Sequence, residues 1–164
     1  MSAIPEEHLA ALRRYLSTDF GIVDSALRQI DYARLKELDE FIRFVTYGLF
    51  QLPSFQGVVY RGADLSTDAL AHYIPGTVVF EHAFVITTAD PARRFLGNTT
   101  FVIASINGRD VSILADLPEQ QEVVFFTGTR FKVLATEYDA RVEDYYIYLA
   151  EIPYPNLLQG YSQE

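Results

Sequence analysis

The segment Leu117–Val133, LPEQQEVVFFTGTRFKV, decides the fold of the second half of the chain. The apolar run Glu122–Phe126 predicts a buried strand that begins on an acidic residue. The Thr-Gly-Thr that follows predicts a tight turn, and Arg130–Leu134 alternates polar with apolar residues as a half-buried strand does. Gln120 and Glu122 are two positions apart, so on one strand their side chains would point the same way. The segment therefore predicts a hairpin that carries an amide and a carboxylate on one face.

A second informative segment is Phe55–Gly62, FQGVVYRG, a short apolar strand that ends on Arg61. A buried guanidinium without a partner costs free energy, and its planar fork suits phosphate or carboxylate. Gly62 would let a ligand approach the backbone closely. The structural alternatives are an ion pair of Arg61 at the rim, and a surface hairpin whose Gln120 and Glu122 are solvated.

Together these segments resemble the Arg-Ser-Glu class of mono-ADP-ribosyltransferases, of the toxin and effector type. In that family a strand ending Tyr-Arg-Gly is followed by a Phe-x-Ser-Thr-Ser strand, and then by a Glu/Gln-x-Glu strand with a Gly-Thr-x-Phe-x-Val hairpin. The chain has corresponding segments in the same order, which are Tyr60–Gly62, Phe84–Thr88, Gln120–Phe125 and Gly128–Val133. The resemblance covers Phe55 to the C-terminus and is to the Gln-x-Glu variant.

The resemblance implies that NAD is the substrate. Glu122 would bond the ribose 2′-hydroxyl and support an oxocarbenium-like transition state. Arg61 would hold the phosphates or the nicotinamide-side ribose, and the backbone at Gly62 would hold the carboxamide. Gln120 would face the acceptor. An amide cannot act as a general base, and in the family Gln at this position goes with acceptors other than arginine.

The chain departs from the family pattern at two places. Ile86 stands where the family has the serine that bonds the catalytic glutamate, while Thr87 and Thr88 match the next two positions and are assigned to the NAD site. In the Rho-modifying exoenzymes a Phe stacks on nicotinamide, and an Arg three residues later contacts phosphate. Phe95 matches this aromatic residue and Asn98 replaces the Arg, so both are assigned to the NAD site.

Two questions about this loop stay open at the level of sequence. Arg93 or Arg94 could supply the charge that the family has at the position of Asn98. Phe95 could instead fill the core beneath the turn.

Length and composition predict one domain over residues 1–164, because 49% hydrophobic residues with 12 Phe and 11 Tyr suffice for a core. We expect a helical part over residues 1–52, in which Pro5 begins a helix, Asp24 caps a second and Leu35–Leu49 forms a third. The β-sandwich core would span residues 55–153. The expected strands are Thr77–Phe80, Ala83–Thr88, Thr99–Ile106, Asp110–Ala115, Glu122–Phe126, Phe131–Tyr138 and Asp144–Glu151.

Helices followed by strands predict an α+β fold, and short links favour antiparallel pairing into two packed sheets. The resemblance implies a split β-sandwich with an NAD cleft. The net charge of −9 disfavours nucleic acid as a partner. The absence of cysteine excludes a thiol nucleophile and cysteine-based zinc, and the separate positions of His8, His72 and His82 predict no metal site.

No segment approaches the roughly 18 consecutive apolar residues of a membrane span, and the N-terminal residues lack signal-peptide features, so we expect a cytoplasmic protein without membrane partners. By resemblance it would transfer ADP-ribose to a protein acceptor other than arginine. A secretion system would deliver it into a target cell as an effector or toxin, and a cognate immunity or inhibitor protein would be a further partner. The alternatives are an NAD glycohydrolase and a catalytically degenerate binding module.

Overall fold

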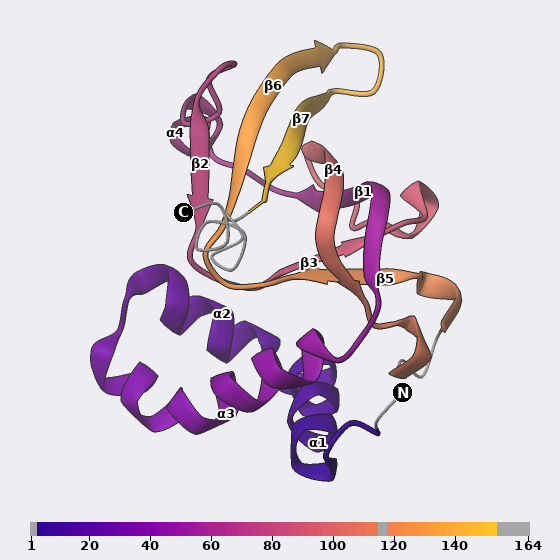
Figure 1. The fold of residues 1–164 in the computed structure, drawn as a ribbon. Helices are drawn as coiled ribbons and strands as arrows, with labels where there is room; N and C mark the ends of the chain where they lie inside the picture. The colour runs from indigo at the N-terminus through magenta and orange to yellow at the C-terminus, as the bar shows by residue number, and fades with distance from the viewer. Residues whose placement is uncertain (1–2, 115–117, 154–164) are drawn as a thin grey trace, which may run out of the picture.

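The computed structural model describes residues 3–114 and 118–153. Three helices come first along the chain and the strands follow, with one short helix after the first strand, which confirms the expected α+β class (Figure 1). The helices are α1 (Glu6–Arg14), α2 (Phe20–Gln29), α3 (Tyr32–Phe50) and the short α4 (Thr67–Ala71). The strands are β1 (Ser54–Ala63), β2 (Val78–Glu81), β3 (Val85–Thr88), β4 (Thr99–Asp110), β5 (Glu122–Phe125), β6 (Thr129–Asp139) and β7 (Asp144–Ile152).

The strands form one continuous sheet in the order β1-β3-β5-β4-β7-β6-β2, and β1 also pairs along β4. Every described pair is antiparallel except β4–β7. The long strand β4 belongs to two halves of the sheet, because Thr99–Ala104 pairs with β7 while Arg109 and Asp110 pair with β5. The split sandwich is therefore made by one sheet that folds on itself.

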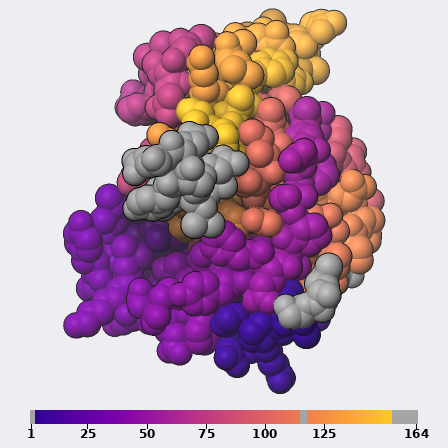
Figure 2. Space-filling model, viewed as in Figure 1, coloured from indigo at the N-terminus to yellow at the C-terminus, as the bar shows by residue number. Residues whose placement is uncertain are grey.

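The two halves pack on a shared apolar core. Its buried members are Val59, Val85, Phe101, Ile103, Val123, Phe125, Phe131, Val133, Ile147 and Leu149. A second core lies between the helices and the β3–β5 side of the sheet, and it includes Leu12, Tyr15, Val45, Leu49, Phe84 and Val124. Helices α1, α2 and α3 thus occupy one end of the molecule, whereas the β6–β7 pair and the short α4 lie at the other (Figure 1 and Figure 2).

In the helical part, the expected apolar stripe of α3 is confirmed, since Val45 and Leu49 are fully buried. The prediction that Asp24 caps a helix is wrong. Asp24 lies inside α2, and the Tyr15 hydroxyl donates to its two carboxylate oxygens at 3.0 and 2.9 Å. A turn of π-helix over Tyr15–Asp19 joins α1 to α2 in this position. No helix of the described ranges is both long and apolar enough to cross a membrane.

Two expectations about the strands are also wrong. The turn after β5 does not close a hairpin, because β5 pairs with β3 and β4 whereas β6 pairs with β7 and β2. At this turn the chain passes from one half of the sheet to the other. In place of a strand over Asp110–Ala115, Ser112–Leu114 forms a 3-10 helix, and the Asp110 carboxylate accepts from the Ser112 backbone N–H at 2.9 Å. Ala115 lies outside the described residues.

Candidate active site

Three neighbouring strands bring the two halves of the predicted site together. Tyr60 on β1 pairs with Thr88 on β3, and Thr88 pairs with Glu122 on β5. Arg61 and Glu122, which are far apart along the chain, therefore border one cleft of about 240 Å³. The cleft is lined by Tyr60, Arg61, Gly62, Ile86, Thr87, Thr88, Arg93, Arg94, Phe95, Gln120 and Glu122. Of the eight predicted site residues, the structure brings together all but Asn98.

A second cleft of about 460 Å³ extends the site toward the helices. It shares Arg61, Ile86 and Glu122 with the first, and its other lining residues are Leu16, Phe20, Gly21, Asp24, Arg28 and Phe84. The sequence analysis did not predict this contribution from α2. The sequence carries little signal for it, because Asp24 and Arg28 look like ordinary helix residues until the fold brings α2 close to Arg61.

Arg61 is a half-buried cation with no hydrogen-bond or ion-pair partner among the described residues. Within residues 3–114 and 118–153 its side chain makes no hydrogen bond or ion pair, and its guanidinium carbon lies 5.7 Å from the centre of the Phe101 ring. Burial, followed by the positive charge of Arg28, lowers the pKa of Arg61. The rim ion pair considered as an alternative is therefore not observed in the described residues, and the cleft carries a charge that an anionic ligand would neutralise.

Glu122 is half-buried, and burial raises the pKa of its carboxyl group. Its side chain has no hydrogen-bond partner in the described part of the chain. Ile86 borders both clefts beside Glu122 and offers no hydroxyl donor to the carboxylate. The carboxylate is therefore available to a ligand that can donate a hydrogen bond to it.

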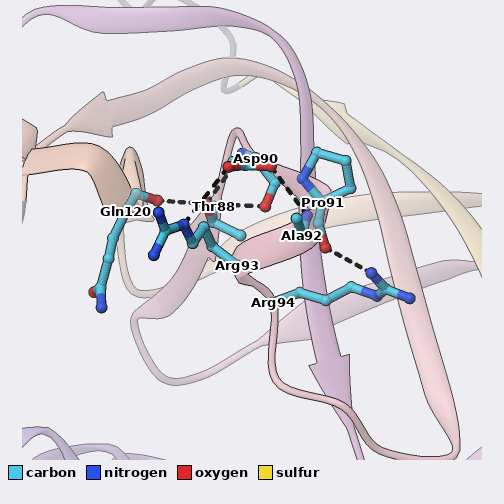
Figure 3. A network of polar contacts seen from close by, with 7 residues as sticks. All are labelled: Thr88, Asp90, Pro91, Ala92, Arg93, Arg94 and Gln120. Carbon is cyan, nitrogen blue, oxygen red and sulfur yellow. Dashed lines mark hydrogen bonds and ion pairs between the residues drawn. The ribbon is translucent and has the colours of Figure 1, made fainter.

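The hydroxyls of Thr87 and Thr88 hold the backbone on the two sides of Glu122. Thr87 Oγ1 donates to the carbonyl oxygen of Val123 at 2.7 Å. Thr88 Oγ1 donates to the carbonyl oxygen of Gln120 at 2.5 Å, as Figure 3 shows. Both side chains border the cleft, but their hydroxyls are already bonded to backbone. These threonines thus hold the backbone around Glu122, and the direct NAD contact that the resemblance implies for them stays a prediction.

Gln120 and Glu122 do not share a strand, contrary to the prediction. Gln120 ends a 3-10 helix over Pro118–Gln120, Gln121 has a left-handed φ of 50°, and Glu122 begins β5. The change of direction at Gln121 breaks the alternation that a continuous strand would give. Gln120 and Glu122 nevertheless line the same cleft, and the amide of Gln120 extends away from Thr88 in Figure 3.

The loop that contains Phe95 crosses the end of β1. A Cβ atom at Gly62 would lie 1.5 Å from the Phe95 carbonyl oxygen, so the loop backbone, rather than a ligand, requires glycine there. The Phe95 side chain is 61% exposed, which excludes the alternative that it fills the core. The aromatic ring is therefore accessible at the border of the cleft.

Arg93 and Arg94 leave this loop in different directions (Figure 3). Arg94 Nε donates to Thr100 Oγ1 at 3.0 Å, and its Nη1 donates to the Pro91 carbonyl oxygen at 2.6 Å. The Arg93 side chain is 49% exposed and makes one ion pair, between its Nε and Asp90 Oδ2 at 3.8 Å. Arg94 thus anchors the loop, while Arg93 extends on the side of Gln120.

Asn98 is committed to the loop backbone and does not line the cleft. Its Oδ1 accepts from the Leu65 N–H and its Nδ2 donates to the Leu65 carbonyl oxygen, each at 2.9 Å. Its own N–H donates to Asp64 Oδ1 at 3.0 Å. The structure therefore gives Asn98 a structural role in place of the expected cofactor contact.

Comparison with curated proteins finds relatives among ADP-ribosyltransferases. The chain is 34% identical over 142 residues to Mav of Mycobacterium avium (strain 104), which is provisionally named an NAD(+)–arginine ADP-ribosyltransferase. It is 30% identical over 133 residues to the NAD(+)–protein-arginine ADP-ribosyltransferase Tre1 of Pseudomonas putida (strain GB-1). These alignments cover 83% and 80% of the chain but only 17% and 26% of the relatives. The chain thus spans about a quarter or less of their length, and no protein-family model matches it.

Solved structures with the same architecture include bacterial effectors and toxins. The type III effector XopAI of Xanthomonas axonopodis pv. citri matches with a TM-score of 0.76 and 26% identity, covering 89% of this chain and 66% of its own. The ADP-ribosyltransferase Vis, a toxin of Vibrio splendidus, matches with a TM-score of 0.81 and 20% identity in its agmatine complex, covering 93% and 77%. The chain therefore has the fold of ADP-ribosyltransferases of the toxin and effector type.

Proposed function

We propose that the chain is an NAD-dependent mono-ADP-ribosyltransferase domain of a bacterial effector or toxin. The observation that carries the proposal is the meeting of Arg61 and Glu122 in one cleft, where neither side chain has a hydrogen-bond or ion-pair partner among the described residues. A dinucleotide that brings phosphates to Arg61 and a ribose hydroxyl to Glu122 would satisfy both groups. The relatives and the fold support this choice of ligand.

The chemistry requires few protein groups. Nicotinamide is already a good leaving group, so the main task is to stabilise the positive charge that develops on the ribose. An ionised Glu122 supplies a fixed negative charge in a partly desolvated cleft, where electrostatic interactions are stronger than in water. The ribose 2′-hydroxyl would donate to Glu122, which replaces the donor that Ile86 does not provide.

The two clefts offer room for the two halves of NAD on either side of Arg61. Phe95, which is exposed at the border of the cleft, would stack on nicotinamide. We assign the phosphate contact to Arg93, because Arg94 is bonded to Thr100 and Pro91. A solved neighbour, exoenzyme S of Pseudomonas aeruginosa, was determined bound to carba-NAD and aligns with a TM-score of 0.74. Its complex supports NAD as the ligand of this fold.

We propose that the acceptor is a protein side chain whose modification does not require a carboxylate at position 120. The amide of Gln120 can orient an asparagine, another amide or a hydroxyl, but it cannot take a proton from a guanidinium. An arginine acceptor is the second candidate, because Mav and Tre1 are named for arginine and Vis was solved with agmatine, a guanidine compound. Under that alternative a group other than Gln120 would have to accept the proton.

Incubation with NAD labelled in the ADP-ribose part, with and without target-cell lysate, tests the proposal. Label on a protein that survives denaturation supports the transferase, and mass spectrometry of the modified peptide identifies the acceptor residue. Free ADP-ribose alone would instead indicate an NAD glycohydrolase. A protein that neither binds nor turns over NAD would be a degenerate binding module, and the proposal would be wrong.

Delivery and partners belong to the proposal as well. XopAI is a type III effector, and Mav and Tre1 are several times longer than this chain. We propose that the domain enters a target cell through a secretion system and that a cognate immunity or inhibitor protein protects the producing cell. Co-expression with the neighbouring genes tests this point, because a true inhibitor would abolish labelling and co-purify with the domain.

A further inference from the structure

The loop that contains Arg93, Arg94 and Phe95 lies at the border of the NAD cleft, and hydrogen bonds of Arg94 hold it in place. The Nε–H of Arg94 donates to Thr100 Oγ1 at 3.0 Å, and the Thr100 hydroxyl donates to Asp144 Oδ2 at 3.0 Å. Thr100 lies on β4, and Asp144 is the first residue of β7. These hydrogen bonds therefore connect the loop, through Thr100 six positions later and Asp144 a further 44 positions along the chain, to the parallel strand pair β4–β7.

The chemistry of the three groups fixes the direction of these hydrogen bonds. The guanidinium of Arg94 can only donate and an ionised Asp144 can only accept. The Thr100 hydroxyl, which has one hydrogen, must give it to Asp144 and keep its lone pairs for Arg94. The Thr100 hydroxyl thus links Asp144 to Arg94, and loss of this hydroxyl would break both hydrogen bonds.

The anchor is buried, so water does not readily replace it. Thr100 is 4% exposed and Asp144 is 7% exposed. Asp144 Oδ1 is buried without a hydrogen-bond partner within the described ranges, so the contact of Oδ2 with Thr100 is the side-chain hydrogen bond of this carboxylate in that part of the chain. A second contact from the same place supports the other end of the loop, since the Tyr145 N–H donates to the Asn98 carbonyl oxygen at 2.8 Å.

We propose that Thr100 and Asp144 are positioning residues for NAD binding, which act through Arg94 on the loop that presents Arg93 and Phe95. The inference rests on the proposed function, because it assumes that NAD occupies the cleft. Arg94 holds the loop so that its exposed neighbours Arg93 and Phe95 meet the substrate without first being ordered. Residues outside the cleft would thus set the affinity for NAD.

Steady-state kinetics with NAD separate this role from a catalytic one. We expect Thr100→Val, which matches threonine in shape, to raise KM for NAD by about tenfold with kcat changed by less than about twofold. Thr100→Ser keeps the hydroxyl and should stay within about threefold of the original KM. Asp144→Ala should act like Thr100→Val, and the double variant should be no worse than Thr100→Val, because both changes break one connection.

A purely structural role predicts a different pattern. If Thr100→Val lowered the melting temperature but left KM unchanged, or if it lowered kcat at constant KM, the inference would be wrong. Additive effects of Thr100→Val and Asp144→Ala would also contradict it, since independent contributions would not pass through Thr100.

A readout without NAD distinguishes this inference from the proposed function. The chain has no tryptophan, so Phe95→Trp introduces a single fluorescent reporter into the loop. In that background Thr100→Val should increase the amplitude of fast local motion in the fluorescence anisotropy decay, and Thr100→Ser should not. An unchanged decay would overturn the inference. Failure of the unsubstituted protein to bind NAD would instead overturn the proposed function, whatever the loop does.

Discussion

Thr88 and Glu122 are paired across β3 and β5, and the hydroxyl of Thr88 holds the carbonyl oxygen of Gln120 two residues before the carboxylate. Thr87 bonds the carbonyl oxygen of Val123 directly after it. The backbone at Glu122 is thereby fixed from both sides, although Ile86 stands where the family pattern that the sequence resembles has a serine. The two threonines thus help to position Glu122 through its backbone, where a serine at position 86 would do so through a hydrogen bond to the carboxylate.

The missing hydroxyl at position 86 leads to a first prediction. Ile86→Ser should provide Glu122 with a donor, lower the pKa of its carboxyl group and raise kcat for nicotinamide release by about three- to tenfold. The change also removes apolar volume, so we expect a lower melting temperature. Ile86→Val is the matched control, because it shortens the side chain without adding a donor. Equal kcat values in the two variants would show that Glu122 does not need the bond.

The pH dependence of turnover provides a second prediction. Burial raises the pKa of Glu122, and only its ionised form supports the cation, so kcat should fall as the pH drops through a value above the usual 4.5. Because Asp24 borders the second cleft and also titrates in this range, the profile should be measured in an Asp24→Asn background as well. The acidic limb should persist there. If the fall in kcat at low pH disappeared in Asp24→Asn, it would be due to Asp24 and not to Glu122.

Asp24 itself should make the stability of the fold depend on pH. Burial raises its pKa to about 6 from 3.8, although the hydrogen bond from Tyr15 opposes the shift. The folded protein then binds a proton at Asp24 more tightly than the unfolded chain does, so the contribution of this group to stability should be fully present below about pH 4 and be lost as the pH rises to about 6. The loss should amount to about 3 kcal/mol at most. Urea unfolding of the original chain and Asp24→Asn should diverge over this interval, and parallel curves would disprove the assignment.

The role of Gln120 gives a fourth prediction. Gln120→Glu places a carboxylate at the acceptor side of the cleft, so transfer to arginine or to free agmatine should appear or increase at least about tenfold. Hydrolysis of NAD should change little, because Gln120 would not take part in nicotinamide release. Product analysis by mass spectrometry after incubation with agmatine measures both. If hydrolysis were lost while acceptor preference stayed the same, Gln120 would belong to the NAD chemistry.

The elements with strong local signals could be predicted from the sequence. The apolar stripe of α3 and the short β-rich segments gave the correct class, and the resemblance brought Arg61 and Glu122 together before any contact was known. The partners of β5 were not predictable, since its pairing with β3 and β4 depends on tertiary packing rather than on the turn that follows it.

Predictions about individual residues of the site were wrong for the same physical reason. The left-handed Gln121 removes Gln120 from the strand, and the hydrogen bonds of Asn98 to Leu65 occupy a side chain that seemed suited to a ligand. The role of Gly62 depends on a loop that lies more than thirty positions later in the chain. Long-range contacts of this kind leave no periodic pattern, so residue type alone indicated the location of the site but not the function of each member.

The most direct test of the central claim compares NAD binding with turnover in Glu122→Ala. Arg61 and the rest of the cleft remain in that variant, so calorimetry should show an NAD affinity within about threefold of the unsubstituted domain. Nicotinamide release should fall by at least about 100-fold, because the developing positive charge loses its carboxylate. Turnover near the original rate with NAD bound would contradict the account.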